Sequence, residues 1–268
     1  MCESTPAYEK LIEEYRQAAV RHADETGWRT DGDLGYAWIF CTTDISIFQF
    51  TSTRSSEVPK QVFGTGPLEG ILVFDRYSGY NKLPVNIQYC YAHLLRTVED
   101  LGKKFEFDQE VQRFVASFAP LLSEAMRIHS LRCTDEAYYR QAHRLRDKIL
   151  EVVNAEAVHL GIRNIQDIFR TQEKRLYPWA SDRRVPAHNN RAERDLRSTV
   201  IARKVSFGSQ SLAGAKARSV LMTILHTARK RLPGGDLESW FKECLDIIAR
   251  DPSVDTYSLL PPPFINSS

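Results

Sequence analysis

The sequence has few cysteines and no long hydrophobic run, and each shortage argues against a class of protein. Its five cysteines are odd in number and widely scattered, and none forms a CxxC pair. That usage is typical of reduced thiols and argues against a disulfide framework or a zinc ribbon within these residues. No apolar stretch approaches the roughly 20 residues of a membrane-spanning helix, and no signal-peptide pattern opens the printed sequence. We therefore expect a cytoplasmic protein with no membrane partner.

Acidic residues are scarce in one part of the chain, and this scarcity predicts the kind of partner. Residues 183–231 hold twelve Lys or Arg and two acids, whereas residues 1–182 hold 22 bases and 26 acids. The formal net charge of +2 therefore conceals a basic segment on a slightly acidic body. Such a segment predicts a polyanionic partner, most simply a nucleic acid, and a merely solubilising surface is the weaker alternative.

The hydrophobic pattern predicts an α/β protein. Apolar, β-branched and aromatic runs predict five strands, at residues 19–26, 36–43, 45–50, 70–75 and 86–91. The first strand is expected to end near Asp24. The fourth, an unbroken apolar run that ends in Asp75, is typical of a strand buried on both faces. In a sheet ordered 3-2-1-4-5, the first and fourth strands would be neighbours.

Helical spacing predicts most of the remaining chain. An amphipathic pattern covers residues 6–18, and residues 108–175 read as a helical insertion. Later helices are expected at residues 189–198, 217–228 and 236–249, with residues 200–208 extended between the first two. The helix at 217–228 is expected to bury an apolar stripe made of Ala217, Val220, Leu221, Ile224, Leu225 and Ala228.

The length of 268 residues allows one large domain or one domain with an insertion. A hydrophobic content of 43% and a charged content of 26% are ordinary for a globular protein. The element pattern divides the chain into an N-terminal helix and lead-in (1–21), the first part of the core (22–107), a helical insertion (108–180), the helices that complete the core (181–250) and a tail (251–268).

Three carboxylates, Asp24, Asp75 and Glu193, occupy positions that a shared site would require. Taken alone, Glu193 is best explained by an ion pair with Arg197 on a solvated helix. Asp24 and Asp75, however, are expected on neighbouring strands, and a helix packed on that sheet would bring Glu193 beside them. Converging carboxylates need a cation, and their hard oxygens suit Mg²⁺ or Mn²⁺. Two such ions would stabilise the attacking and leaving oxygens of a phosphoryl transfer.

Other acids close to these three are given lesser roles. Glu25 and Asp31 are expected to be exposed side chains with no part in the site. Asp195 follows Glu193 by two residues and should point away from it on a helix.

Four segments of the chain resemble the IS66-family transposases, a DDE group with an RNase H-like catalytic domain. They are HADETGWRTDG, ILVFDRYSGYNKL, IQYCYAHLLR and HNNRAERDLRSTVIARKVSFGSQSLAGAKARSVLMTIL. The resemblance runs from about His22 to Arg231, with the motifs in family order. It implies that Asp24, Asp75 and Glu193 are the DDE triad and metal ligands, and that the helical region between the last two is the family's insertion. The implied fold is an RNase H-like mixed five-stranded sheet flanked by helices.

The resemblance also implies an activity and its partners. The chain would be a DDE transposase catalytic domain that uses Mg²⁺ or Mn²⁺, as two ions, to cleave and transfer DNA strands for an insertion sequence. Its partners would be the DNA of element ends and target, further copies assembled on that DNA, and accessory proteins of the same element. Two alternatives stay open: an RNase H-like structure-specific nuclease, and an inactive or decayed remnant that only binds DNA.

The sequence departs from the family in two places. Arg76 follows the second aspartate, where the family usually has glycine, and its side chain would either crowd the metal site or contact a phosphate. The family's full-length proteins carry an N-terminal part with DNA-binding and zinc-binding segments, whereas this sequence begins just before the first catalytic strand. We therefore expect a catalytic domain without that part.

Six basic residues are the best candidates for phosphate contacts, although each alone is better explained as ordinary surface charge. They are Arg191, Arg194, Arg203, Lys204, Lys216 and Arg218. Trp28 and Tyr77 closely follow the two aspartates and are expected to be core aromatics, with base stacking as the alternative.

Overall fold

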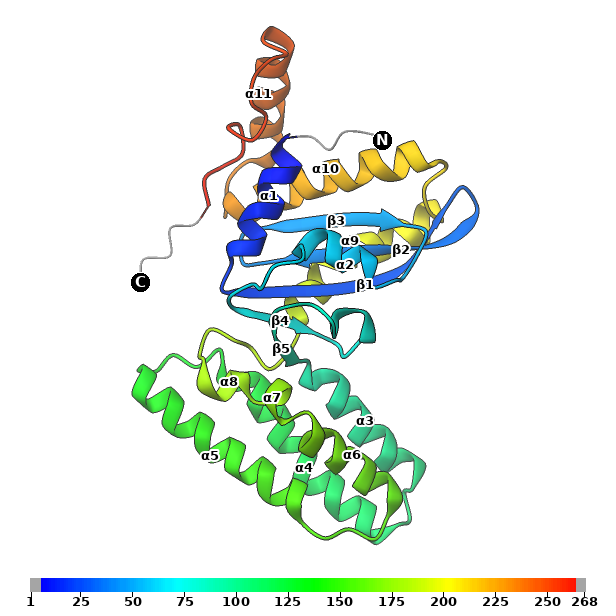
Figure 1. Ribbon diagram of the computed structural model, residues 1–268, viewed down its shortest axis with the longest axis vertical. Helices are drawn as coiled ribbons and strands as arrows, with labels where there is room; N and C mark the ends of the chain where they lie inside the picture. Colours follow the sequence, from blue (N-terminus) through cyan, green and yellow to red (C-terminus); the bar gives the residue numbers. More distant parts are fainter. Residues whose placement is uncertain (1–5, 264–268) are drawn as a thin grey trace. The chain divides into compact units, whose positions relative to one another are not determined.

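The computed structural model of the chain describes residues 6–263. Five strands form one mixed sheet in the predicted order, β3-β2-β1-β4-β5 (Figure 1). The β1–β2 and β2–β3 pairs are antiparallel, and β4 and β5 are parallel. The strands span Val20–Thr30 (β1), Asp33–Cys41 (β2), Ser46–Thr51 (β3), Ile71–Phe74 (β4) and Asn86–Tyr89 (β5). A mixed sheet of this order with flanking helices is consistent with the RNase H-like arrangement that the sequence predicts.

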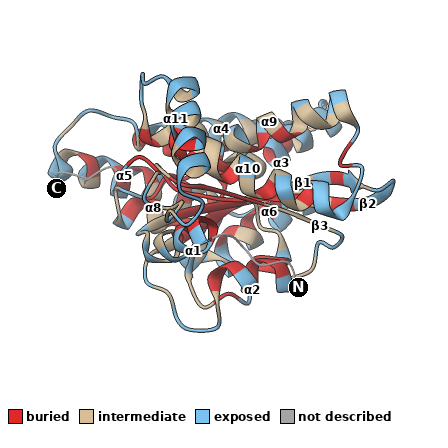
Figure 2. Cartoon of the chain, turned by 90° about the horizontal axis from the view of Figure 1, so that it is seen from above, coloured by how far each residue is buried: buried red, intermediate tan, exposed pale blue. Residues whose placement is uncertain are grey.

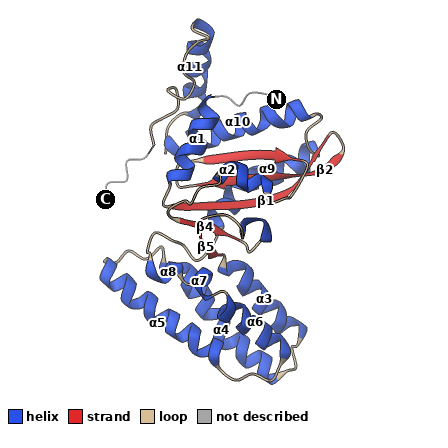
Figure 3. Ribbon diagram, viewed as in Figure 1, coloured by secondary structure: helices blue, strands red, loops and turns tan. Residues whose placement is uncertain are grey.

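The chain divides into two compact units, the first comprising residues 1–70, 78–84 and 190–268 and the second residues 71–77 and 85–189. Figure 3 distinguishes their helices from the strands. The first unit has α1 (Pro6–Gln17), α2 (Glu57–Phe63), a 3-10 turn at Ser78–Tyr80, α9 (Asn190–Ser206), α10 (Leu212–Arg231) and α11 (Leu237–Arg250). The second has α3 (Tyr91–Lys104), α4 (Gln109–Ile128), α5 (Asp135–Asn154), α6 (Leu160–Thr171), α7 (Glu173–Leu176) and α8 (Pro178–Ser181).

The strands of the first unit bury side chains on both faces, and the strand interiors are mostly buried in Figure 2. Alternate residues of β2 point to opposite faces. Phe40 contacts the rings of Tyr15 from α1 and Phe63 from α2. Ile39 instead lies in a buried cluster with Ala192 of α9. The helices α1 and α2 therefore cover one face of these strands, and α9 covers the other.

β1 is longer than predicted, and this changes the position of Asp24. The β1–β2 ladder continues without interruption to the Thr30–Asp33 pair. It ends in a turn where Asp31 and Gly32 have φ values of 55° and 82°. Because the pairing with β2 carries the strand past Gly27, Asp24 lies in the middle of β1 and not near its end.

α9 is also longer than predicted, because residues 200–206 are helical and not extended. Leu196 and Thr199 are buried on the face of α9 that packs against the sheet. Arg203 continues this face and is hydrogen-bonded to β1. Tertiary contacts thus override the extended preference of the β-branched residues in this segment.

The buried face of α10 differs from the predicted apolar stripe, of which only Ala228 is fully buried. Three hydroxyl residues, Ser219, Thr223 and Thr227, are buried at four-residue spacing against the edge strand β3. They accept hydrogen bonds from the backbone N–H groups of Ser46, Phe48 and Phe50, at 2.9–3.3 Å. The edge of the sheet therefore finds its hydrogen-bond partners in a helix, which removes an unpaired edge.

In the second unit, α4 packs against α3 and α5, and α5 packs against α6 and α8. The core of this unit includes Tyr91, whose hydroxyl donates to the carbonyl of Leu176 at 2.6 Å and accepts from the indole N–H of Trp179 at 3.0 Å. Within residues 6–263, no helix combines the length and the apolar character needed to cross a membrane.

Candidate functional site

Asp24 projects from the face of the sheet that α9 covers. Its Cα partner on β2 is Ile39, and directly paired residues of antiparallel strands place their side chains on the same face. Ile39 in turn is packed with Ala192 and Leu196 of α9. Asp24 is half-buried, and one carboxylate oxygen accepts a hydrogen bond from the Glu25 N–H at 2.9 Å. A rigid strand therefore holds this carboxylate beside the covering helix.

Glu193 lies in the first turn of that same helix. It follows Ala192 directly, and Ala192 belongs to the cluster that contains Ile39, the β2 partner of Asp24. Glu193 is exposed. The backbone N–H groups and the positive dipole end of a first helical turn favour a carboxylate there. Asp24 and Glu193 thus flank one apolar cluster on one face of the first unit.

The direction of α9 supports this proximity. Arg203, near the end of α9, donates hydrogen bonds to Thr26 and Gly27, and the chain beyond α9 pairs in parallel with the end of β1 at Thr30 and Ser209. The helix therefore runs in the same direction as the strand. At about 1.5 Å per helical residue and about 3.3 Å per strand residue, the first turn of α9 comes level with about residues 21–22 of β1, two to three residues before Asp24.

Asp195 lies on the opposite flank of α9 from Glu193. Its carboxylate accepts hydrogen bonds from the Ser46 hydroxyl at 2.7 Å and from the Lys230 ammonium at 2.6 Å. Both side chains of the Lys230–Asp195 ion pair are largely buried. The expectation that Asp195 points away from Glu193 is confirmed, and its role is to join α9 to β3 and α10.

Asp75 directly follows β4, as predicted, and belongs to the second unit. One of its oxygens accepts a hydrogen bond from the Tyr77 N–H at 3.1 Å, so Asp75 also caps the turn after its strand. Arg76 has a φ of 74°, in the left-handed region that glycine adopts without steric cost. Its Nε atom is buried without a hydrogen-bond partner. The backbone conformation thus explains why glycine suits this position better than arginine.

Glu25 is not the exposed acid that the sequence predicts. Only 1% of its side chain is exposed, and it forms an ion pair with Arg54 at 2.5 Å. It also accepts a hydrogen bond from the Tyr80 hydroxyl at 2.7 Å. Because it alternates with Asp24 along β1, Glu25 points to the opposite face of the sheet. No sequence signal distinguished it, since Arg54 and Tyr80 are distant in the chain.

The six basic candidates all lie on α9 and α10. Arg194 and Lys204 are exposed, and the other four are half-buried: Arg191, Arg203, Lys216 and Arg218. Arg203 is engaged by β1, and the guanidinium of Arg218 lies 5.1 Å from the ring centroid of Trp28. Trp28 is 2% exposed, so it is a core aromatic as expected.

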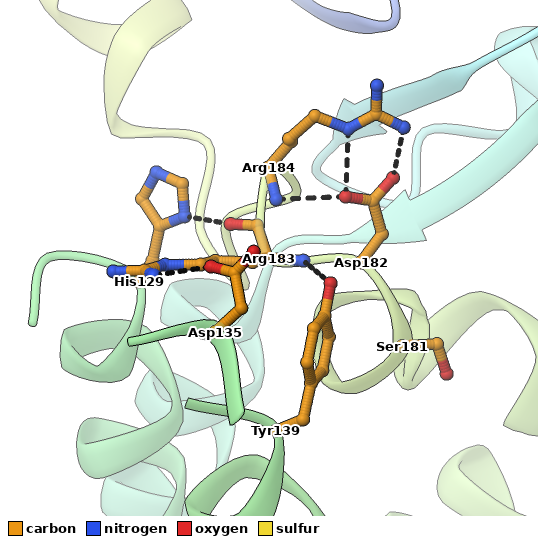
Figure 4. Close-up of a pocket in the computed structure, with 7 residues that line it drawn as sticks. All are labelled: His129, Asp135, Tyr139, Ser181, Asp182, Arg183 and Arg184. Carbon is orange, nitrogen blue, oxygen red and sulfur yellow. Dashed lines mark hydrogen bonds and ion pairs between the residues drawn. The ribbon is translucent and has the colours of Figure 1, made fainter. Parts of the chain in front are cut away.

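The second unit contains a hollow of about 640 Å³, and none of the candidate residues named above lines it (Figure 4). The lining residues are His129, Asp135, Tyr139, Ser181, Asp182, Arg183 and Arg184. Arg183 pairs with Asp135 at 2.6 Å, and Arg184 pairs with Asp182 at 2.8 Å. The hydrogen bond from Arg184 lowers the pKa of Asp182. Both guanidinium groups are thus neutralised by carboxylates, and Arg183 also donates to the Leu131 carbonyl, so the network holds the α4–α5 loop.

The RNase H-like sheet, with one carboxylate on its first strand and another on the helix that covers the same face, defines an α/β protein of the RNase H-like class. The sequence profile of the Transposase IS66 family matches residues 3–217, and the chain therefore belongs to the IS66 family of transposases. It is also similar to the uncharacterized protein y4hP of Sinorhizobium fredii (strain NBRC 101917 / NGR234), with 27% identity over 293 residues. That match covers 94% of this chain and 52% of y4hP, so the chain spans about half the length of this curated relative.

Proposed function

We propose that this chain is the catalytic domain of a DDE transposase that cleaves DNA at the ends of an insertion sequence and joins them to target DNA. Asp24, Asp75 and Glu193 would hold one or two Mg²⁺ or Mn²⁺ ions. Membership of the IS66 family supports a transposase role and DNA as the partner. Assembly of several copies on that DNA, with accessory proteins of the same element, belongs to the same proposal.

The observation that carries the proposal is the position of Asp24. It lies on the face of the sheet that α9 covers, and Glu193 lies in the first turn of that helix, directly after the buried Ala192. Asp75 directly follows a buried strand, β4, which also suits the position of a metal-binding carboxylate. Strand β1 and helix α9 are both rigid elements, and such elements position catalytic side chains well.

The donor chemistry fits a hard divalent cation. Carboxylate oxygens are the preferred ligands of Mg²⁺ and Mn²⁺, and Asp24 and Glu193 are both at least partly accessible to solvent. When bound, the cations would neutralise the charge that develops on the phosphodiester. The three carboxylates would hold those cations, without which they would repel the scissile phosphate. Water would displace the 3′ oxygen from phosphorus, which leaves a 5′ phosphate and a free 3′-hydroxyl. That hydroxyl would then attack a target phosphodiester in the same in-line geometry and displace the 3′ oxygen of the target strand, which leaves as a hydroxyl after taking up the proton that the attacking oxygen loses.

Metal titration of single carboxylate variants tests the site. We expect calorimetry with Mn²⁺ to detect binding by the wild type and a loss of at least tenfold in affinity for Asp24→Asn, Asp75→Asn and Glu193→Gln. Asp33→Asn is a matched control, because Asp33 is an exposed acid of the same hairpin. Bound metal should also raise the melting temperature of the wild type by linkage. Equal binding by all variants, or melting that is indifferent to millimolar metal, would refute the proposed site.

One observation favours the alternative of an inactive DNA-binding remnant. Arg76, beside Asp75, has a backbone conformation suited to glycine and brings a cationic side chain to the residue after the second aspartate. This alternative predicts DNA binding without metal binding, which the same titration distinguishes. A nuclease that hydrolyses without joining would bind metal and release 3′-hydroxyl ends but form no joined product.

A further inference from the structure

The segment that joins α9 to α10 presents an aromatic side chain to solvent from a clamped, strained backbone. Phe207 is 76% exposed and has a φ of 58°, a left-handed conformation that is unfavourable for a bulky residue. Its backbone N–H is bound to the carbonyl of Arg203 at 2.9 Å. The ring is not part of the core, and the backbone conformation disfavours phenylalanine, so neither packing nor backbone preference explains this residue.

The residues after Phe207 hold this segment against the end of β1. The Ser209 N–H donates a hydrogen bond to the Arg29 carbonyl at 2.9 Å, and the Ser209 carbonyl accepts a second one from the Asp31 N–H at 2.8 Å. The Ser209 hydroxyl accepts a third from the buried indole of Trp28 at 3.2 Å. At Gly208, a Cβ would stand 2.2 Å from the Arg29 carbonyl oxygen, so the approach is too close for any side chain. The backbone that carries the exposed ring is therefore held in place.

The surroundings of Phe207 carry positive charge. Residues 196–235 include eight Lys or Arg and no acid. Lys204 precedes Phe207 by three residues and is exposed. Arg218 reaches the same place through its contact with the Trp28 ring. Two exposed acids, Asp31 and Asp33, lie at the tip of the β1–β2 hairpin. The positive charge near Phe207 therefore comes from α9 and α10.

We propose that Phe207 is a stacking wedge for an unpaired or distorted base of DNA. An aromatic face accepts any base, and flanking cations hold the phosphates on either side. A protein partner would more often meet a neutral or mixed-charge surface, whereas this one is complementary to a polyanion. The inference rests on the proposed function, since it assigns DNA to this side of the same unit. It adds a contact that distinguishes distorted from fully paired DNA.

The test measures DNA binding in chelator, so that it does not depend on the metal site. The full 268-residue chain is titrated by fluorescence anisotropy against a duplex with a short unpaired end and against the same duplex fully paired. The wild type should prefer the unpaired end, and 2-aminopurine at the unpaired position should report stacking. Phe207→Asn should lower affinity for the unpaired end roughly tenfold, as expected for loss of one stacked base. Phe207→Trp should restore it.

Two readouts separate a stacking role from a structural one. Asparagine tolerates a positive φ better than phenylalanine, so Phe207→Asn should keep or raise the melting temperature while it loses the preference. Val205→Ala is the matched control, because Val205 is 77% exposed at the end of α9, and it should leave the preference unchanged. Unaltered preference in Phe207→Asn would overturn this inference alone. A change of oligomeric state without a change of binding would identify a protein contact instead. No DNA binding by the wild type would overturn both proposals.

Discussion

Arg203 donates a hydrogen bond to the carbonyl oxygen of Gly27 at 2.6 Å and another to the Thr26 hydroxyl at 3.1 Å, and these bonds tie the end of α9 to β1. The first turn of the same helix carries Glu193. A contact at one end of α9 therefore helps to set the position of a proposed metal ligand at the other end. Arg203 is for this reason a positioning residue in the fold as well as a candidate for DNA binding.

The first prediction separates those two roles. Arg203→Ala should lower the free energy of unfolding by about 1–2 kcal/mol, because it removes charge-assisted hydrogen bonds from backbone and hydroxyl acceptors. Lys204→Ala is the control: its exposed side chain should change stability by less than about 0.5 kcal/mol and reduce the salt dependence of DNA affinity by about one phosphate contact. Denaturant unfolding and gel shifts at several salt concentrations measure both. Equal stability of the two variants would contradict the anchoring role.

The second prediction concerns the hydroxyl ladder on the edge of the sheet. Thr223→Val keeps the shape of the side chain but leaves the Phe48 N–H without its partner, which should cost about 1–3 kcal/mol. Thr223→Ser keeps the hydroxyl and should recover most of that loss. Unfolding curves for the two variants give the comparison. If valine proves as stable as serine, the edge strand does not depend on this bond.

Much of the fold was predictable because the chain's local patterns agree with its topology. The apolar run before Asp75 is typical of a buried strand and forms β4, and the sheet has the order that the sequence analysis considered. The length of β1 could not be predicted, because Gly27 resembles a strand end until its pairing with β2 is known. The buried face of α10 was missed for a related reason: its hydroxyls become core residues only where β3 offers unpaired N–H groups.

The candidate site was predictable in part. Asp24 and Glu193 were singled out from their sequence context, and their roles as metal ligands stay a prediction; the structure places Asp24 on the face that α9 covers and Glu193 in the first turn of α9. The burial of Glu25 was not predictable, since it depends on Arg54 and Tyr80 arriving from other parts of the chain. Phe207 was missed because an aromatic residue in an apolar-looking segment is ordinarily assigned to the core, and only its exposure and positive φ mark it out.

The third prediction is a pH dependence of stability that comes from His226. Burial lowers the pKa of His226, and the nearby Lys230 and Arg229 act in the same direction against the opposing effect of Asp195. The unfolded chain, with an ordinary histidine pKa of about 6.5, then binds the proton more readily than the folded one. The stability that comes from keeping the buried His226 neutral is fully present above about pH 6.5 and is lost as the pH falls toward the lowered pKa of folded His226. Melting temperatures measured between pH 5 and pH 8 should fall less steeply on acidification in His226→Gln, whereas His143→Gln, at an exposed position, should retain the wild-type slope.

The last prediction concerns Arg76, whose φ of 74° places a long side chain in a conformation that favours glycine. Arg76→Gly relieves about 1–2 kcal/mol of strain in the left-handed backbone. Glycine also raises the conformational entropy of the unfolded chain, which offsets part of that gain. The net effect should be a gain of roughly 0.5–1 kcal/mol in unfolding free energy. Asp31→Gly is the control, because Asp31 also has a positive φ of 55° but aspartate tolerates it in an exposed turn, and little gain is expected. The variant also loses a cation next to Asp75, so its affinity for Mn²⁺ in calorimetry should rise severalfold. A stability gain without a change in metal affinity would mean that Arg76 strains the backbone but does not face the proposed metal. A loss of stability would show that packing of the half-buried Arg76 side chain outweighs the strain.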